Sequence, residues 1–320
     1  MHIAMSASFT PIGVCLLAVA SVVAAEPPVA VLRHDTTVLT VALPDAQTGY
    51  YRGPRFDWGG MVIQAEWHGH TCFTELKRPH DPLLHDHAAG ACEEFGFSGP
   101  DGYDETPVGG RFLKIGVGAL VRDTAKPYSF GHPYPIAEAA GWKVEPGESA
   151  LRFVQDFTLD AHLAYHYEKT VTVRSDGFRI ARRIEARGDR PIITTHYCHN
   201  MFAIDQQPID GTWRMELGWD AVANHSAPSF TMTGRTLSLV GPVSRTVWTD
   251  FSWPVAPATT DLSLIHGASQ TTIRIVTDAP PASMSFYAEA TAICPEPFVN
   301  VRAEPGSACT WTTDYIFSGP

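Results

Sequence analysis

Residues 167–185 read YEKTVTVRSDGFRIARRIE, two stretches of alternating side chains separated by a Ser-Asp-Gly turn. Alternation with a period of two is the pattern of a β-strand, and a short turn that contains glycine joins antiparallel neighbours. This stretch therefore predicts a β-hairpin. The same alternation recurs over residues 151–157, 271–276 and 283–287, and no run of fifteen residues keeps a helical apolar stripe. The sequence predicts an all-β protein.

The two ends of the chain differ in character. Residues 11–25 are small and apolar and end in Val-Ala-Ala, which is typical of a secretory signal peptide and too short to cross a bilayer. The 26 glycines and 25 prolines of the whole chain are scattered along it and form no linker between domains. We expect a signal peptide over residues 1–25 and one β-sandwich domain over residues 28–320. The mature protein would be soluble, and periplasmic or secreted.

Charge limits the classes of binding partner, and the cysteine count limits the possible disulfides. With 23 Lys and Arg against 34 Asp and Glu, the net charge is −11. No basic run appears, so nucleic acid and anionic membranes are poor partners. Five cysteines follow residue 25, an odd number, and their spacing matches no zinc finger. Export permits a disulfide, with Cys72–Cys92 and Cys294–Cys309 as the nearest pairs; the spacing favours neither.

Two short motifs carry candidate catalytic groups. Residues 195–202 read THYCHNMF, with His196 four residues before Asn200, and Glu296 lies between two prolines about a hundred residues later. A histidine and a glutamate that meet in space can pass protons on opposite sides of a small substrate. His196 and His199 are three residues apart, so on a strand they point to opposite faces and only one can enter a cleft.

The run from residue 165 to residue 205, which contains the first of these motifs, resembles the galactose mutarotase-like superfamily. In aldose 1-epimerases the motif is Asn-His-Thr-Tyr-Phe-Asn-Leu. Aligned without a gap, its histidine falls on His196 and its asparagine on Asn200, and the late glutamate of the family falls on Glu296. The resemblance implies an antiparallel β-supersandwich with a carbohydrate in its concave face and no cofactor. It also implies anomer interconversion, with Glu296 as base and His196 as acid.

Further residues are expected to bind the sugar. Residues 50–60, YYRGPRFDWGG, combine arginines with aromatic rings, and Arg55 and Trp58 are the candidates there. Asn200 is a third candidate from the motif. The family's early His-Gly-Gly-x-x-Gly-Phe segment is absent. Residues 84–96 stand in roughly its place, and we expect His87 or His85 to take over the role of its histidine.

A metal site is the competing interpretation of that segment. His85 and His87 would face one way on a strand, and Glu93 or Glu94 follows, a set that suits a divalent transition metal. The glycine context and further histidine of cupin-type sites are missing. The sequence therefore favours a polar rim around a sugar cleft, and we expect no metal.

Two other functions compete with an exported aldose 1-epimerase-like enzyme. Phe298 stands where the family usually has glutamine, which is consistent with a different acid/base reaction on a glycan, as in polysaccharide lyases. An acidic chain offers few cations to offset a uronate, which argues against a lyase. The third hypothesis is a carbohydrate-binding protein without catalysis.

Overall fold

The hairpin predicted over residues 167–185 is present in the computed structural model, which describes residues 26–320. Strands β11 (Ala164–Arg174) and β12 (Gly177–Ala186) pair antiparallel, with Val171 opposite Ile180. Gly177 has a φ of 144°, and a Cβ there would come within 2.0 Å of the backbone oxygen of Tyr315, on the strand that pairs with β12 on its other side. Glycine is therefore needed at this turn. The predicted signal peptide, residues 1–25, lies outside the described residues.

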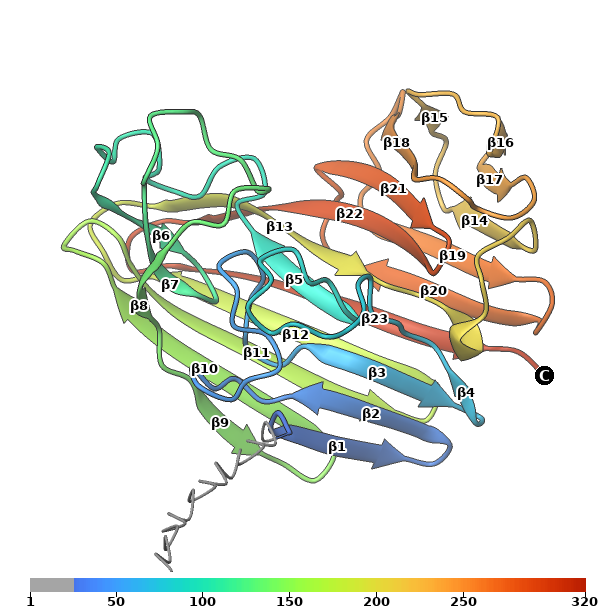
Figure 1. Cartoon of the computed structure of the whole chain (residues 1–320), viewed down its shortest axis with the longest axis horizontal. Coiled ribbons are helices and arrows are strands. Elements are labelled where there is room, and N and C mark those ends of the chain that lie inside the picture. The colour runs from blue at the N-terminus through green and yellow to red at the C-terminus, as the bar shows by residue number, and fades with distance from the viewer. Residues whose placement is uncertain (1–25) are drawn as a thin grey trace, which may run out of the picture.

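Two large antiparallel sheets form most of the molecule (Figure 1). The first sheet has the strand order β1-β2-β3-β5-β13-β22-β21-β18-β15, with β4 paired to β3. Its strands are β1 (Val29–His34), β2 (Thr37–Ala42), β3 (Val62–Trp67), β4 (His70–Thr71), β5 (Ala91–Phe95), β13 (Ile192–Asn200), β15 (Val222–Ala223), β18 (Val247–Ser252), β21 (Ser283–Glu289) and β22 (Ala292–Ala303).

The second sheet contains the hairpin and has the order β16-β17-β14-β19-β20-β23-β12-β11-β10-β9. Besides β11 and β12, its strands are β9 (Lys143–Pro146), β10 (Ala150–Thr158), β14 (Trp213–Leu217), β16 (Phe230–Thr233), β17 (Thr236–Leu239), β19 (Thr260–His266), β20 (Thr271–Thr277) and β23 (Ala308–Ser318). The prediction of an all-β sandwich is confirmed. The remaining elements of residues 26–320 are β6 (Arg111–Lys114), β7 (Gly118–Val121) and β8 (Ile136–Ala139), which form a small sheet, and the 3-10 turn η1 (Ile204–Gln206).

The core lies between the two large sheets. Val171 and Ile180 of the hairpin are fully buried, and they belong to the same apolar cluster as Leu39 and Val62 of the first sheet. Alternate residues on each strand point into this layer, which is why the period of two was visible in the sequence. We call the face of the first sheet that meets the second sheet its inner face.

Loops cover much of the opposite, outer face of the first sheet. The segments 43–61, 72–90 and 96–140, the last including the small sheet, form a second buried cluster together with the first sheet. It contains Phe56 and Phe112 of these segments and Cys294 of β22. In Figure 1 the small sheet and its loops lie at the left, and the edge strand β15 lies at the upper right. The outer face is therefore walled by three long loops, which favours a ligand pocket there.

The cysteines of the described chain are all free. The two pairs that were nearest in sequence are not joined. Cys294 lies on β22 of the first sheet and Cys309 on β23 of the second, so neighbouring positions in the sequence belong to different layers.

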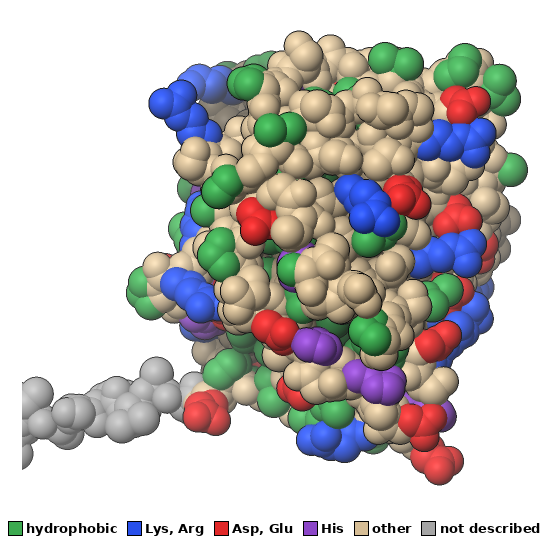
Figure 2. All heavy atoms as spheres, turned by 90° about the vertical axis from the view of Figure 1, so that its right-hand side faces the viewer, with side chains coloured by type: hydrophobic (Ala, Val, Ile, Leu, Met, Phe, Trp, Pro, Cys, Tyr) green, Lys and Arg blue, Asp and Glu red, His purple; other side chains and the backbone are tan. Residues whose placement is uncertain are grey.

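The surface shows mixed charge on the side viewed in Figure 2. Lys and Arg side chains there are interspersed with Asp and Glu rather than gathered in a patch. On the second sheet, Arg274 pairs with Asp261 and Arg214 pairs with Glu216. Among residues 26–320, no helix has the length and apolar character needed to cross a membrane.

Candidate active site

A pocket of about 270 Å³ opens on the outer face of the first sheet. This volume is close to the lower end for ligand pockets, roughly 300–1,000 Å³, and therefore suits a small molecule. Strands β13, β18, β21 and β22 and the three covering loops contribute its walls. The lining residues are Arg55, Leu76, Asp86, Phe97, Phe130, Tyr197, His199, Thr246, Trp248, Tyr287 and Glu296.

His199 and Glu296 meet in the pocket. Strands β13 and β22 are antiparallel neighbours with Tyr197 opposite Phe298, and continuing that register places His199 beside Glu296 on the outer face. The His199 Nδ1 atom lies 2.8 Å from Glu296 Oε1, and both side chains are about nine-tenths buried. This is an imidazole and a carboxylate within hydrogen-bond reach, the arrangement that general acid–base chemistry needs.

A thiol completes this group. Cys294 Sγ lies 2.8 Å from His199 Nδ1 and 3.4 Å from Glu296 Oε1. Burial and the adjacent Glu296 carboxylate raise the pKa of the Cys294 thiol well above its ordinary value. The sulfur therefore stays protonated at neutral pH and acts as a weak hydrogen-bond partner rather than as a nucleophile.

Arg55 lies beside this group and is held on several sides. Its Nε atom lies 2.9 Å from Glu94 Oε2, its Nη2 atom lies 2.9 Å from the Tyr197 hydroxyl, and Nη1 pairs with Asp86. Lys114 Nζ donates to Glu94 Oε1 at 3.0 Å. Burial alone would raise the pKa of Glu94, but Lys114 and Arg55 outweigh it and lower that pKa. Glu94 is thus an anion that orients Arg55, and its pairing with two cations offsets the cost of burial.

His196 points the other way, into the layer between the sheets. Its Nε2 atom lies 3.2 Å from Glu93 Oε1, and the Trp311 indole N–H donates to its Nδ1 at 3.3 Å. The structure thus brings Glu296 together with His199 and does not bring it together with His196. The reason is the alternation of the strand, because residues three apart face opposite sides.

The predicted sugar-binding residues are divided between the pocket and the interior. Arg55 lines the pocket, as Glu296 does. Asn200 is buried on the inner face, where its Oδ1 accepts a hydrogen bond of 2.8 Å from Tyr315 of the second sheet. Trp58 is buried, and its indole N–H donates to the Gly53 carbonyl.

His85 and His87 do not line the pocket either. His85 is half-buried in the loop between β4 and β5, and His87 is fully buried beneath it. The structure also does not bring these histidines to Glu93 or Glu94. Glu93 pairs with Lys169 and Arg182 between the sheets, whereas Glu94 faces Arg55 on the outer face. His87 instead meets two other residues of its own loop, which are described below.

A sequence signal for His199 was present in the motif itself. If the family motif is moved three residues along, its histidine falls on His199 and its phenylalanine on Phe202, and Ile204 takes the place of its leucine. The period of two also places Cys294 and Glu296 on one face of β22. The loop residues Asp86 and Phe130 gave no such signal, because their approach to the pocket depends on how the loops fold over the sheet.

The position of His196 makes a pH-dependent contribution to stability. Burial lowers the pKa of His196 to about 4 from an ordinary value of 6.5. Between these values the unfolded chain binds a proton that the folded chain does not, so stability falls as the pH falls. From pH 7 to pH 5 the loss amounts to about 2 kcal/mol.

We expect His196→Gln to remove this component, since glutamine keeps polar contacts and does not titrate. The free energy of unfolding, measured in urea at pH 7 and pH 5, should fall by about 2 kcal/mol more in the wild type than in the variant. An equal pH dependence in the two proteins would contradict the buried, neutral state of this imidazole.

Comparison with known proteins identifies the fold. No family model matches the sequence, and no curated protein matches it in sequence. The structure of the Slr1438 protein from Synechocystis sp. PCC 6803 is similar over 94% of this chain and 99% of its own, with 15% identity and a TM-score of 0.60. A galactose mutarotase-like protein from Lactobacillus casei ATCC 334 is similar over 91% of this chain and 100% of its own, with 10% identity and a TM-score of 0.57.

A galactose 1-epimerase from Lactobacillus acidophilus NCFM shows the same likeness over 90% of this chain and 93% of its own, with 11% identity and a TM-score of 0.53. At this level of identity the likeness concerns the fold. The β-sandwich fold that the resemblance to the galactose mutarotase-like superfamily implies is confirmed.

Proposed function

We propose that this protein interconverts the α and β anomers of a neutral aldose, as an aldose 1-epimerase does. The observation that carries this proposal is the His199–Glu296 pair in a pocket on the outer face of the first sheet. The fold supports it, since structural neighbours include a galactose 1-epimerase.

The reaction needs two groups that exchange protons with the two oxygen atoms bonded to the anomeric carbon. A base takes the proton of the anomeric hydroxyl while an acid protonates the ring oxygen, and the C1–O5 bond opens to an aldehyde. After rotation about C1–C2 the ring recloses on the other face, with both proton transfers reversed. In this proposal Glu296 is the base and His199 is the acid. Their contact of 2.8 Å suits this task, because the two substrate oxygens are bonded to the same carbon.

The charge of the pocket favours a neutral sugar. Among the described residues that line it, Arg55 is the only Lys or Arg, and Asp86 and Glu94 already hold its guanidinium. A uronate or a sugar phosphate would meet Glu296 without a free cation to offset its charge, which argues against a lyase. Trp248 and Phe130, each more than two-fifths exposed, offer apolar rings against which a pyranose can pack.

The proposed place of action is outside the cytoplasm, in the periplasm or the medium. This part of the proposal rests on the signal-peptide pattern of residues 11–25. Detection of a mature chain that begins near residue 26 in the exported fraction would support it, and retention of the intact N-terminus inside the cell would contradict it.

The direct test follows anomer exchange with the purified mature protein. Polarimetry on freshly dissolved α-glucose and α-galactose, together with NMR exchange spectroscopy on a panel of other aldoses, measures the rate above the spontaneous one. Acceleration for one or more neutral aldoses is expected. Saturable binding of a sugar without acceleration would contradict the proposal and favour a carbohydrate-binding protein.

A further inference from the structure

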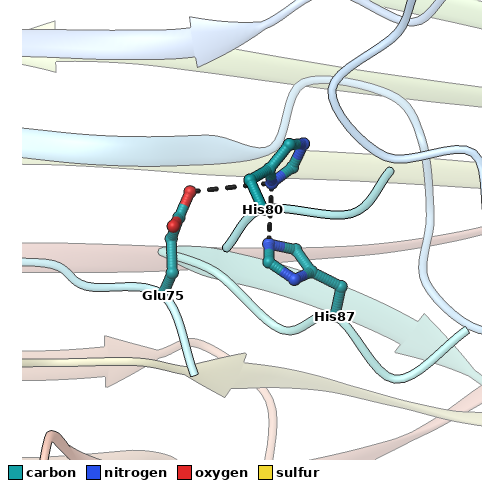
Figure 3. Close-up of side chains that lie close together, drawn as sticks. All are labelled: Glu75, His80 and His87. Atoms are coloured by element: carbon teal, nitrogen blue, oxygen red, sulfur yellow. Dashed lines mark hydrogen bonds and ion pairs between the residues drawn. The ribbon is translucent and has the colours of Figure 1, made fainter. Parts of the chain in front are cut away.

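A second cluster of ligating side chains lies in the loop that joins β4 to β5. Glu75, His80 and His87 converge there, with their side chains pointing toward one another (Figure 3). His80 Nδ1 lies 2.9 Å from His87 Nε2 and 3.7 Å from Glu75 Oε1. The three ligating atoms lie within 4.8 Å of one another. Two imidazole nitrogens and a carboxylate oxygen thus lie close together.

The two spacings from His80 Nδ1, 2.9 Å and 3.7 Å, are each within about 0.5 Å of the ligand spacing in a tetrahedral zinc site. Nitrogen and oxygen ligands lie about 2.0–2.1 Å from zinc, and ligands at that distance are roughly 3.3 Å apart in a tetrahedron. The two histidine nitrogens would move apart by about 0.4 Å to admit the ion. His87 is fully buried, whereas Glu75 and His80 are each about one-quarter exposed, so the cluster is anchored on one side and reachable on the other.

The surroundings hold Glu75 and His80 in place. The Tyr50 hydroxyl donates to Glu75 Oε1, and the Tyr50 ring packs on His80 with centroids 4.2 Å apart. Arg78 approaches the other carboxylate oxygen, with its Nε atom 3.9 Å from Glu75 Oε2. Such outer partners orient the ligands of a metal and are part of a functional site. Glu75 also lines an open cavity of about 450 Å³, through which an ion or a water molecule can enter.

We propose that Glu75, His80 and His87 form a binding site for a divalent transition metal ion of the zinc class. Three protein ligands leave the fourth position for water. The metal would tie the start of the loop to its end, because Glu75 and His87 are twelve residues apart and enclose the segment 76–86. A clip of this kind removes conformational freedom from the loop that it closes.

Metal binding would affect the pocket indirectly, through the loop segment that the metal closes. Leu76 and Asp86, which both line the pocket, are the first and last residues of the enclosed segment, and Asp86 pairs with Arg55. The metal would therefore order two residues of the pocket wall without contacting a substrate. This inference does not depend on the proposed anomer exchange, because it predicts metal binding and loop order in the protein without sugar.

Titration of metal-free, tag-free protein with ZnCl₂ tests the site. Calorimetry should show one zinc ion per chain with a Kd below about 1 μM. His80→Ala and His87→Ala should each weaken binding by roughly 100-fold or more, because loss of outer partners alone costs 10–100-fold. His85→Ala is the matched control, a histidine of the same loop outside the cluster, and should bind as the wild type does. No binding below 1 mM, or equal binding by all four proteins, would overturn the proposal.

Cobalt distinguishes this cluster from the thiol-containing group of the pocket. Co²⁺ bound by two histidines and a carboxylate gives tetrahedral ligand-field bands without the intense thiolate charge-transfer band of a Co–S bond. A thiolate band that disappears in Cys294→Ser would place the ion at Cys294 and overturn the assignment. Hydrogen exchange gives a readout separate from activity. Zinc should slow the exchange of backbone amides across residues 76–86 in the wild type. It should not change their exchange in His87→Ala. Unchanged exchange in the wild type would contradict the ordering of the loop by the metal.

Discussion

Replacing Glu296 with glutamine is expected to lower the rate of enzyme-catalysed anomer exchange by about 10²–10⁴-fold. Glutamine keeps the size of the side chain and its carbonyl oxygen, so the contact of Glu296 Oε1 with His199 can persist. It cannot accept the proton of the anomeric hydroxyl, and this loss of base function is the reason for the effect. Progress curves for a responsive aldose, at saturating and at low concentration, separate kcat from KM. The decrease should lie in kcat.

The matched control is Glu304→Gln, a change of the same type at an exposed glutamate just beyond the end of β22. It should keep the rate of the wild type. His199→Asn and His196→Gln then decide which histidine works with Glu296. We expect the first to lose activity as Glu296→Gln does and the second to retain it. Full activity of Glu296→Gln, or selective loss of activity in His196→Gln, would contradict the proposed pair.

Removing the charge of Glu93 is expected to cost about 3–5 kcal/mol of stability. Four charged groups are buried between the sheets, Asp57 and Glu93 against Lys169 and Arg182, and each side chain is no more than about 3% exposed. Lys169 Nζ lies 2.8 Å from Asp57 Oδ2 and also contacts Glu93, which pairs with Arg182 as well. The charges balance, so Glu93→Gln leaves two buried cations with one carboxylate.

Denaturant unfolding measures this effect, with Glu304→Gln again as the exposed control, expected within about 0.5 kcal/mol of the wild type. A double variant, Glu93→Gln with Arg182→Met, restores the balance of charge, because one cation then faces one carboxylate. Its loss of unfolding free energy should therefore be smaller than the sum of the losses in the two single variants. Strict additivity, or a loss below about 1 kcal/mol for Glu93→Gln, would show that the network does not stabilise the fold as described.

Much of the fold could be predicted from the local alternation of apolar and polar residues. The strands over 151–157, 271–276 and 283–287 appear as β10, β20 and β21, because alternate apolar residues have to reach the core between the sheets. The resemblance of residues 165–205 to the superfamily also led to the right architecture. It did so because the hairpin and the motif strand that follows it carry this alternation in order.

The candidate site was predictable only in part. Glu296 and Arg55 line the pocket, whereas His196 and Asn200 lie on the inner face of the same strand. Both histidines of THYCHNMF lie on β13, and a shift of three positions in a short alignment exchanges them. Nothing in the one-dimensional pattern distinguishes the two faces here, because both are covered, one by the second sheet and the other by loops.

The sequence by itself determined the strands, the turn at Gly177 and the opposite orientation of His196 and His199, because these follow from the period of two and from local backbone sterics. Only the tertiary structure decided which histidine meets Glu296 and which residues His87 meets. The first depends on the register between β13 and β22, and the second on how a loop closes on itself. The first contact joins residues about a hundred positions apart, and the second forms only when the loop closes. Packing against the rest of the molecule decides both.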